Sequence, residues 1–471
     1  MRKTKIIATL GPACDNHKTL TEMVKAGLNV ARLNMSHGTQ QEHARRIATV
    51  KRVRQELAQP VALLLDTRGP EIRLECFRDG QVEVVEDAEF VIVNHSVQGS
   101  AREASVTCAD FYRIVKKGDI VLINDGLIRM QVDRIEGEDV HLRVLSGGVI
   151  SDHKSINVPG VLLNLPYLSE QDKSDLLFGI EQDVDFVAAS FVSNAEDVLI
   201  LKRFLAQNGG MHIQVIAKIE SRKGVENIDE IIDAADGIMV ARGDLGVEIS
   251  YEQLPQIQKL LIKKARAAGK RVITATEMLE SMIHSPRPTR AEASDVANAV
   301  YDGTSAIMLS GETAAGQYPV QAIRTMALIA QNTECGIHYR KRFMACDFQV
   351  RNIADAISSA AVKSSMDLDC AAIIVVTESG KSARMISRFR PACPVIAVTA
   401  NLKSYYQLGM SWGVLPLIGQ YQSDVETLFR HAMDTAKYCR AVGAGDQVAL
   451  VASSQVGCSG STNLLKIQRI D

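Results

Sequence analysis

The chain has 471 residues, which is too many for one ordinary hydrophobic core and predicts two or three domains. Hydrophobic residues make up 46% and charged residues 23%, so most of the chain is expected to fold. A formal net charge of −2 provides no general basic field for nucleic acid, and no stretch approaches the roughly 20 apolar residues that span a bilayer.

The N-terminal segment and the cysteines give no sign of secretion. The apolar run that follows the first basic residues stops at Gly11-Pro12 and is too short for a signal peptide. The nine cysteines form no CxxC pair and the ten histidines form no HxxxH pair, which argues against a zinc site and a disulfide framework. We expect a reduced, cytoplasmic protein with neither a nucleic-acid nor a membrane partner.

Short apolar runs recur eight times with helical stretches between them. They are KIIATLG (5–11), NVARLNMS (29–36), VALLLDTR (61–68), DFVAASFV (185–192), IQVIAKIE (213–220), GIMVARGD (237–244), RVITATEM (271–278) and AIMLSGET (306–313). Most are apolar on both faces, which is typical of buried parallel strands. Eight βα units in sequence predict an α/β protein with a (β/α)₈ TIM barrel, formed by residues 1–69 and 167–344.

Two other segments depart from this pattern. Residues 70–166 alternate apolar and polar positions between Gly- and Asp-rich turns, which predicts an inserted small β-barrel domain with antiparallel strands. An insertion of this length in a barrel loop is expected to cover the active face as a lid. From residue 345 strand-like and helical runs restart, so 345–471 are predicted to form a C-terminal open α/β domain.

Polar residues stand where the predicted barrel strands end, which is where barrel enzymes carry their active sites. They are Arg32, Asn34 and Ser36, then Asp66 and Thr67, then Lys218 and Glu220, then Arg242 and Asp244, and finally Thr276. Glu220 and Asp244 supply two hard oxygen ligands of the kind that suits Mg²⁺. The alternative is that both carboxylates merely cap the helices that follow.

Several longer segments together resemble the signature segments of pyruvate kinases. They are RLNMSHG (32–38), LDTRGPEIR (65–73), AKIES (217–221), MVARGDLGVE (239–248), ATEMLESM (275–282), RPTRAEASDVANAV (287–300) and MLSGETAAGQYP (308–319). The resemblance covers nearly the whole chain. It implies transfer of the phosphoryl group from phosphoenolpyruvate to ADP, which gives pyruvate and ATP in the last step of glycolysis. It also implies Mg²⁺ (or Mn²⁺), K⁺ and a cytoplasmic homotetramer.

The resemblance also assigns roles to residues. Lys218 is expected to stabilise the phosphoryl group in flight, Arg73 to hold the substrate phosphate, and Thr276 to assist protonation of the enolate. The backbone amides of Arg242, Gly243 and Asp244 are expected to bind the substrate carboxylate. The nucleotide is assigned to Arg32, Asn34 and His37. The K⁺ site is assigned to Asn34, Ser36, Asp66 and Thr67, whose alternative interpretation is an ordinary hydrogen-bonded cluster.

Two loops of the C-terminal region are rich in Gly and hydroxyl residues, which commonly cradle phosphate. They resemble the sugar-phosphate effector site of pyruvate kinases. The residues concerned are Thr377, Ser379, Gly380, Lys381 and Ser382 in the first loop, and Ser459, Gly460, Ser461 and Thr462 in the second. Fructose 1,6-bisphosphate is the expected effector, with adenosine or sugar monophosphates as alternatives. Two surface turns without a ligand remain possible.

A few positions depart from the family pattern. Arg68 stands where Lys is usual, Met35 where Phe is usual and Glu277 where Gln is usual. Glu71 stands where the family carries either Glu or Lys, and the glutamate predicts that the enzyme requires potassium. The competing hypotheses are a different barrel enzyme that enolises pyruvate, such as a lyase, and a catalytically silent metabolite sensor. The potassium set, Lys218 and the inserted β domain argue against the first, and intact Lys218, Glu220, Asp244 and Thr276 argue against the second.

Overall fold

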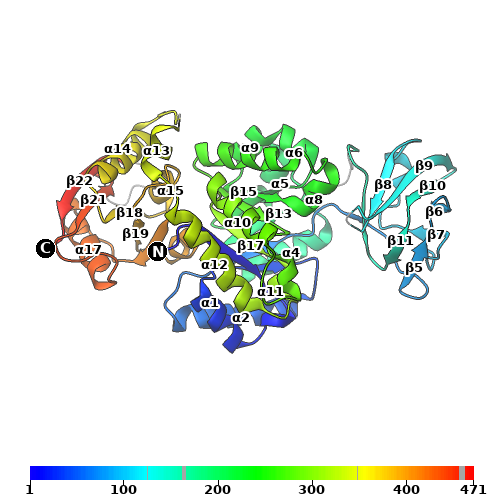
Figure 1. Ribbon diagram of the computed structural model, residues 1–471, viewed down its shortest axis with the longest axis horizontal. Helices are drawn as coiled ribbons and strands as arrows, with labels where there is room; N and C mark the ends of the chain where they lie inside the picture. The colour runs from blue at the N-terminus through cyan, green and yellow to red at the C-terminus, as the bar shows by residue number, and fades with distance from the viewer. Residues whose placement is uncertain (125, 162–165, 347, 456–461) are drawn as a thin grey trace.

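The computed structural model describes residues 1–124, 126–161, 166–346, 348–455 and 462–471. Three parts lie in a row along the long axis of the molecule, with a barrel in the centre (Figure 1). The part formed by the C-terminal residues lies at one end of the barrel, and the inserted β part lies at the other.

The central part is a closed barrel of parallel strands, as the sequence predicts. Around the barrel the strands follow the order β1-β17-β16-β15-β14-β13-β3-β2. Their bounds are β1 (Lys5–Thr9), β2 (Val30–Asn34), β3 (Ala62–Asp66), β13 (Phe186–Ala189), β14 (Gln214–Ile219), β15 (Gly237–Ala241), β16 (Arg271–Ala275) and β17 (Ala306–Leu309). Because these strands are buried on both faces, their sequences are apolar almost throughout.

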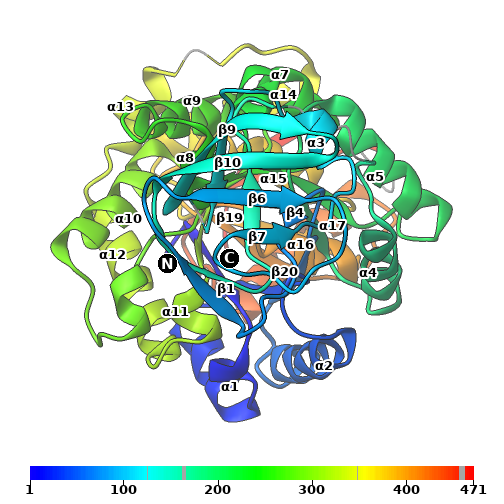
Figure 2. The same ribbon diagram turned by 90° about the vertical axis from the view of Figure 1, so that its right-hand side faces the viewer.

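Helices surround the barrel, and Figure 2 shows them as a ring with the inserted strands in front. They are α1 (His17–Ala26), α2 (Gln40–Glu56), α4 (Glu170–Glu181), α5 (Ala195–Gln207), α6 (Arg222–Glu226), α7 (Ile228–Ala234), α8 (Arg242–Glu248), α9 (Leu254–Ala267), α10 (Arg290–Asp302), α11 (Gly311–Ala314) and α12 (Pro319–Cys335), with short 3₁₀ turns at Pro12–Cys14 and Glu280–Ile283. Capping boxes at Thr39, Ser169 and Thr289 start α2, α4 and α10 by satisfying backbone N–H groups that have no partner within the helix.

The insertion folds as a small β structure. Its main sheet has the order β4-β12-β8-β9-β10-β6-β7, and a second pair joins β11 to β5. The elements are β4 (Ile72–Arg73), β5 (Gln81–Val84), β6 (Glu89–Val93), β7 (Glu103–Ser105), α3 (Phe111–Ile114), β8 (Ile120–Ile123), β9 (Ile128–Glu136), β10 (Asp139–Ser146), β11 (Gly148–Ser151) and β12 (Ser155–Asn157). Thr107 N donates to Arg73 O over 2.9 Å, which brings the two edges of the sheet together.

Most strand pairs of the insertion are antiparallel, as expected, but β6 and β7 run parallel. The sequence pattern could not show this, because strand direction depends on how the intervening chain returns. The insertion leaves the barrel directly after β3, so it lies at the end of the barrel where the parallel strands terminate.

The C-terminal part is an open sheet with the order β20-β19-β18-β21-β22. Its elements are α13 (Tyr339–Met344), α14 (Ile353–Asp367), β18 (Ala372–Val376), α15 (Lys381–Ser387), β19 (Val395–Thr399), α16 (Leu402–Leu408), β20 (Val414–Ile418), α17 (Val425–Tyr438), β21 (Gln447–Ala452) and β22 (Leu464–Arg469). The four parallel strands were predicted. The antiparallel edge strand β22 was missed, because LLKIQR is polar on part of its surface and half-exposed.

This part closes the other end of the barrel. Met410 packs with the residues that fill the barrel interior, and Arg271 at the start of β16 donates to Ser411. The cysteines of the described ranges are all free thiols. In those same ranges no helix is both long and apolar enough to cross a membrane.

Candidate active site

The ends of β2 and β3 bring a cation and a carboxylate together. Asn34 and Asp66 are register partners in neighbouring strands, and Arg32 Nε donates to Asp66 Oδ2 over 2.6 Å. Arg32 also donates to Thr9 at the end of β1. Burial by itself would raise the pKa of Asp66, but Arg32 and Lys218 outweigh it and lower that pKa. Asp66 is therefore an anion that holds two cations at the barrel mouth.

Lys218 lies between two carboxylates. Its Nζ is 3.1 Å from Asp66 Oδ1 and 2.9 Å from Glu220 Oε1, and its side chain is only 11% exposed. Burial opposes the charge of this lysine, but the neighbouring carboxylates raise its pKa above the ordinary value. The side chain therefore remains an ammonium group, which can stabilise negative charge on a transferred group.

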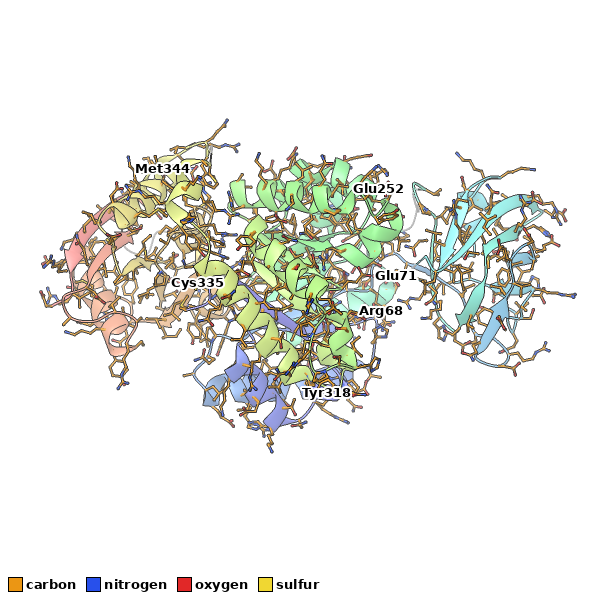
Figure 3. All side chains as sticks on the ribbon, in the orientation of Figure 1. Arg68, Glu71, Glu252, Tyr318, Cys335 and Met344 are labelled. Atoms are coloured by element: carbon orange, nitrogen blue, oxygen red, sulfur yellow. The ribbon has the colours of Figure 1, made fainter. Side chains whose placement is uncertain are left out.

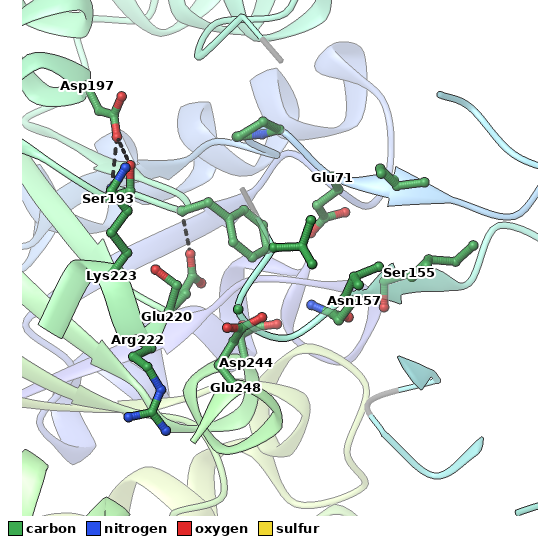
Figure 4. Close-up of a pocket in the computed structure, with 18 of the residues that line it drawn as sticks. Glu71, Ser155, Asn157, Ser193, Asp197, Glu220, Arg222, Lys223, Asp244 and Glu248 are labelled. Atoms are coloured by element: carbon green, nitrogen blue, oxygen red, sulfur yellow. Dashed lines mark hydrogen bonds between the residues drawn. The ribbon is translucent and has the colours of Figure 1, made fainter. Parts of the chain in front are cut away.

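Glu220 and Asp244 lie on one wall of a cavity between the barrel and the insertion. The cavity has a volume of about 440 Å³, and Figure 4 shows the carboxylates of Glu71, Glu220, Asp244 and Glu248 facing it. Glu220 Oε2 accepts from Phe191 N over 2.6 Å, while its buried Oε1 lies 2.9 Å from Lys218 Nζ. Burial raises the pKa of Glu220 to about 8, although Lys218 opposes the rise. A buried carboxylate oxygen of this kind fits a hard cation.

No group of three or more His, Cys, Asp or Glu side chains is placed to hold a metal within the described part of the chain. A pair of carboxylates is nevertheless what Mg²⁺ uses, because it completes its shell with water and substrate oxygens. The geometry therefore favours the metal interpretation of Glu220 over the helix-cap interpretation, since Glu220 receives its hydrogen bond from the preceding strand's end rather than from the helix that follows.

Arg73 belongs to the insertion and contacts Glu71. Its guanidinium donates to Glu71 Oε2 over 2.5 and 2.8 Å and to His153 O over 3.0 Å. Glu71 lies at the end of the barrel that faces the insertion, as does Arg68 (Figure 3). Burial raises the pKa of Glu71, although Arg73 opposes the rise. The predicted phosphate-holding arginine is thus ion-paired with Glu71 and is carried by the insertion.

A strained turn follows β16. Thr276 and Glu277 have φ angles of 66° and 52°, a conformation that is costly for a β-branched residue. Arg242 holds this turn by donating to Thr276 O over 2.5 Å and to Glu277 O over 3.0 Å, and it pairs with Asp295. Gly243 N donates to Thr276 Oγ1 over 2.8 Å. The turn thus fixes the Thr276 hydroxyl beside the start of α8.

The residues predicted to bind potassium lie at the ends of β2 and β3. Asn34 Oδ1 accepts from Ser36 N over 3.2 Å, and Met35 N donates to Asp66 O over 3.0 Å. Thr67 O and Oγ1 both bond to Ser190. This arrangement gathers side-chain and backbone oxygens at one place, which fits a monovalent cation, but most of those oxygens already have protein partners.

His37 lies on the cationic side of the site. Burial and the positive charges of Arg73, Arg32, Arg68 and Lys154 lower its pKa. Cations and carboxylates are paired at the barrel mouth, Lys218 with Glu220 and Arg73 with Glu71, so the site offers groups of both signs to a metal and to phosphate groups.

The two predicted effector loops meet in the C-terminal part. Ser382 Oγ lies 2.5 Å from Thr462 Oγ1, and Gly380 adopts a left-handed φ of 72° before α15. Thr377 is buried, whereas Lys381 is exposed. Ser379 is exposed, and its carbonyl accepts from Arg384. Ser459, Gly460 and Ser461 lie outside the described residues.

Ser190 is the site residue that sequence reasoning missed. It follows β13 directly, is 1% exposed, and accepts from Lys218 Nζ over 2.7 Å. The sequence does place a polar residue at the end of this strand, as it does at the ends of the neighbouring strands. Because serine is common in turns, Ser190 did not stand out as a site residue. The contact of Phe191 with Glu220 is made by the backbone N–H of Phe191, so the residue type in the sequence does not indicate it.

The three departures from the family pattern have different environments. Met35 is 2% exposed and packs in the main core, so it serves as a core side chain. Arg68 lies 3.6 Å from Asp175 at the rim. Glu277 is exposed beside Thr276, and its backbone oxygen is held by Arg242.

Comparison with known proteins agrees with this geometry. The family model described as pyruvate kinase, barrel domain, matches residues 1–323, and the one described as pyruvate kinase, alpha/beta domain, matches residues 355–468. The chain is 47% identical to a pyruvate kinase of Clostridium acetobutylicum, with both chains fully covered. It is also 47% identical to that of Geobacillus stearothermophilus, of which it covers 80%. A pyruvate kinase of Clostridium perfringens is 43% identical over its full length. The chain belongs to the pyruvate kinase family.

Proposed function

We propose that this enzyme transfers the phosphoryl group of phosphoenolpyruvate to ADP and so forms pyruvate and ATP. The observation that carries the proposal is Lys218, a buried ammonium held between Asp66 and Glu220 at the barrel mouth. Phosphoryl transfer requires positioning and charge neutralisation more than covalent chemistry, and this arrangement supplies both.

Each predicted residue has a part in this reaction. Lys218 stabilises the charge on the phosphoryl group as it leaves the enolate oxygen and bonds to the terminal oxygen of ADP. Arg73 holds the substrate phosphate, while Arg32, Asn34 and His37 contact the nucleotide. The Arg242-Gly243-Asp244 turn orients the substrate carboxylate. The Thr276 hydroxyl delivers a proton to the enolate carbon through water.

Two cations complete the site. Glu220 and Asp244 would hold Mg²⁺ (or Mn²⁺), which supplies charge neutralisation at the transferred group. Asn34, Ser36, Asp66 and Thr67 would hold K⁺, which offsets the repulsion between ADP and phosphoenolpyruvate. The buried carboxylate of Glu220, which lines the cavity together with Asp244, supports the first assignment, and the oxygen-rich ends of β2 and β3 support the second.

The insertion acts as a lid that excludes water. Arg73 is anchored there by Thr107 and His153, so closure of the lid would carry the guanidinium toward the phosphate. We propose residues 70–166 as this lid domain, residues 1–69 and 167–344 as the catalytic barrel, and residues 345–471 as the regulatory domain.

The regulatory proposal rests on the loop around Lys381. The contact between Ser382 and Thr462 joins the two Gly- and hydroxyl-rich loops, which supports binding of a phosphorylated activator such as fructose 1,6-bisphosphate. A cytoplasmic homotetramer is the assembly that the family implies.

A coupled assay tests the main proposal. Phosphoenolpyruvate and ADP should give pyruvate and ATP, with a requirement for Mg²⁺ and K⁺, and pyruvate should not form without ADP. Pyruvate formation that does not need ADP would indicate another enolising barrel enzyme. No turnover of phosphoenolpyruvate under any of these conditions would indicate a silent sensor.

A further inference from the structure

One turn at the end of β13 contacts both charged groups of the candidate site. Ser190 follows β13 directly, and Phe191 comes next. The Ser190 hydroxyl accepts a hydrogen bond from Lys218 Nζ over 2.7 Å, and the Phe191 backbone N–H donates to Glu220 Oε2 over 2.6 Å. The roles assigned above leave the Ser190 hydroxyl without a part in the reaction.

Three oxygen atoms surround the ammonium group of Lys218. Ser190 Oγ lies 2.7 Å, Glu220 Oε1 2.9 Å and Asp66 Oδ1 3.1 Å from Lys218 Nζ. An ammonium group has three hydrogens, so these oxygens can engage all of them. Burial lowers the pKa of Lys218, but the carboxylates raise it by more. The hydroxyl has no charge to contribute, so what it adds is the direction of a short hydrogen bond.

The Ser190 hydroxyl is itself fixed by the barrel. It is buried and donates to Thr67 O over 2.7 Å, and it also lies 3.4 Å from Asp66 Oδ1. The Ser190 N–H donates to Thr67 Oγ1 over 3.1 Å, and the Ser190 carbonyl accepts from Tyr167 over the same distance. Because its own hydrogen is committed, Oγ offers Lys218 only its lone pairs. Ser190 is therefore a fixed acceptor for the ammonium group.

The cavity lies on the Glu220 side of the ammonium group. Glu220 lines the cavity between the barrel and the insertion, and Figure 4 shows its carboxylate there. Asp66 and Ser190 are instead tied by further hydrogen bonds to the ends of β2 and β3. A ligand oxygen that reaches Lys218 from the cavity would therefore take the place of the contact with Glu220. The contacts with Asp66 and Ser190 would remain.

We propose that Ser190 is a positioning residue for phosphoryl transfer, because its hydroxyl and Asp66 together direct the third hydrogen of the Lys218 ammonium into the cavity, toward the transferred group. This inference rests on the proposed function and adds a residue to it. A lysine ammonium is a point charge on a flexible stem, so its direction has to be fixed by its surroundings. Without the hydroxyl, Lys218 keeps its charge and loses one of the two contacts that orient it.

Replacing Ser190 with alanine tests the proposal. Ser190→Ala removes the hydroxyl and keeps the backbone contacts of the turn. We expect kcat to fall at least about tenfold, because misdirected groups lose rate steeply. The KM for phosphoenolpyruvate should change less than about threefold, because the charge of Lys218 remains. The matched control Ser358→Ala removes another fully buried hydroxyl, which donates to Ala354 O in α14, and should keep the parent kcat.

Thermal unfolding checks that each variant is folded. If Ser190→Ala does not fold, Ser190→Cys replaces it, because a thiol keeps most of the volume and is only a weak acceptor. The same fall in kcat is expected of this second variant.

A double variant separates positioning from a merely structural role. If Ser190 acts through Lys218, adding Ser190→Ala to Lys218→Met should change the residual kcat less than about twofold, whereas independent losses would multiply. The proposal is overturned if the folded Ser190 variant keeps the parent kcat, if only its KM changes, or if the double variant loses a further tenfold or so. A parent enzyme that does not turn over phosphoenolpyruvate would instead overturn the proposed function, and the assay of the parent enzyme shows this separately.

Discussion

Lys218 Nζ lies 2.9 Å from Glu220 Oε1, and both residues are buried at the end of β14. Residues two apart on a strand point to the same side, so the local geometry of the chain alone brings this cation and this carboxylate together. The ammonium lowers the pKa of the buried Glu220, but by less than burial raises it. Each of the two groups is then available to a ligand of opposite charge.

Replacing Lys218 with methionine should nearly abolish phosphoryl transfer. The variant Lys218→Met keeps the volume of the side chain and removes the charge, and loss of one stabilising donor costs about 10²–10³ in kcat in other enzymes. A coupled assay measures kcat, and calorimetry with phosphoenolpyruvate checks that the substrate still binds. The exposed Lys25→Met serves as a control. Near-normal turnover would remove Lys218 from the mechanism.

The carboxylate pair predicts a changed magnesium requirement. Glu220→Gln and Asp244→Asn should each raise the Mg²⁺ concentration for half-maximal activity at least about tenfold, because each removes an anionic hard ligand. Glu248→Gln is the matched control, since Glu248 lines the same cavity at the other end of α8. If the parent enzyme and the three variants give identical Mg²⁺ titrations, Glu220 and Asp244 do not bind the metal and the helix-cap interpretation holds.

Magnesium affinity should also depend on pH through Glu220. Burial raises the pKa of this carboxyl to about 8, so between its ordinary pKa and that value the metal-free enzyme holds a proton that a bound cation must displace. The affinity for Mg²⁺ should therefore rise by at most about tenfold per pH unit up to pH about 8. Above that pH it should level off. Calorimetric Mg²⁺ titrations between pH 6.5 and 8.5 measure this. The dependence should vanish in Glu220→Gln, and a flat profile in the parent enzyme contradicts the prediction.

Glu71 predicts that the enzyme requires potassium. A fixed cation near the phosphates lowers the repulsion between ADP and phosphoenolpyruvate, and a glutamate cannot supply one. Glu71→Lys should make activity largely independent of K⁺, whereas Glu71→Gln, which removes the negative charge and adds none, should remain dependent. Activity is measured without sodium or potassium, in a quaternary ammonium salt that keeps ionic strength constant. Full activity of the parent enzyme under these conditions would refute the argument.

The effector turn predicts a loss of activation. Replacing Lys381 and Ser382 with alanine removes a cation and the hydroxyl that contacts Thr462, so fructose 1,6-bisphosphate should no longer activate while basal activity persists. Activity is measured at subsaturating phosphoenolpyruvate with and without the effector. Lys466→Ala, at an exposed position of β22, is the control. The parent enzyme is tested also with adenosine and sugar monophosphates. If none of these ligands changes its activity, the regulatory proposal is wrong.

The sequence predicted the architecture because each barrel strand is buried on both faces. Runs such as ALLLD in β3 and GIMVA in β15 are apolar throughout, and that pattern requires a parallel sheet covered by helices. The half-exposed strand β22 escaped prediction, because a short strand at a sheet edge needs neither strict alternation nor a continuous apolar run.

The sequence by itself determined the fold class, the eight barrel strands in chain order, and most of the polar residues that end them, because these depend on local patterns. Only the tertiary structure decided which of those residues meet. Ser190 joins Lys218, Arg242 holds the Thr276 turn, and Arg73 pairs with Glu71. Such contacts depend on how strands and helices that are distant in the sequence pack against one another, and local sequence patterns do not specify that packing.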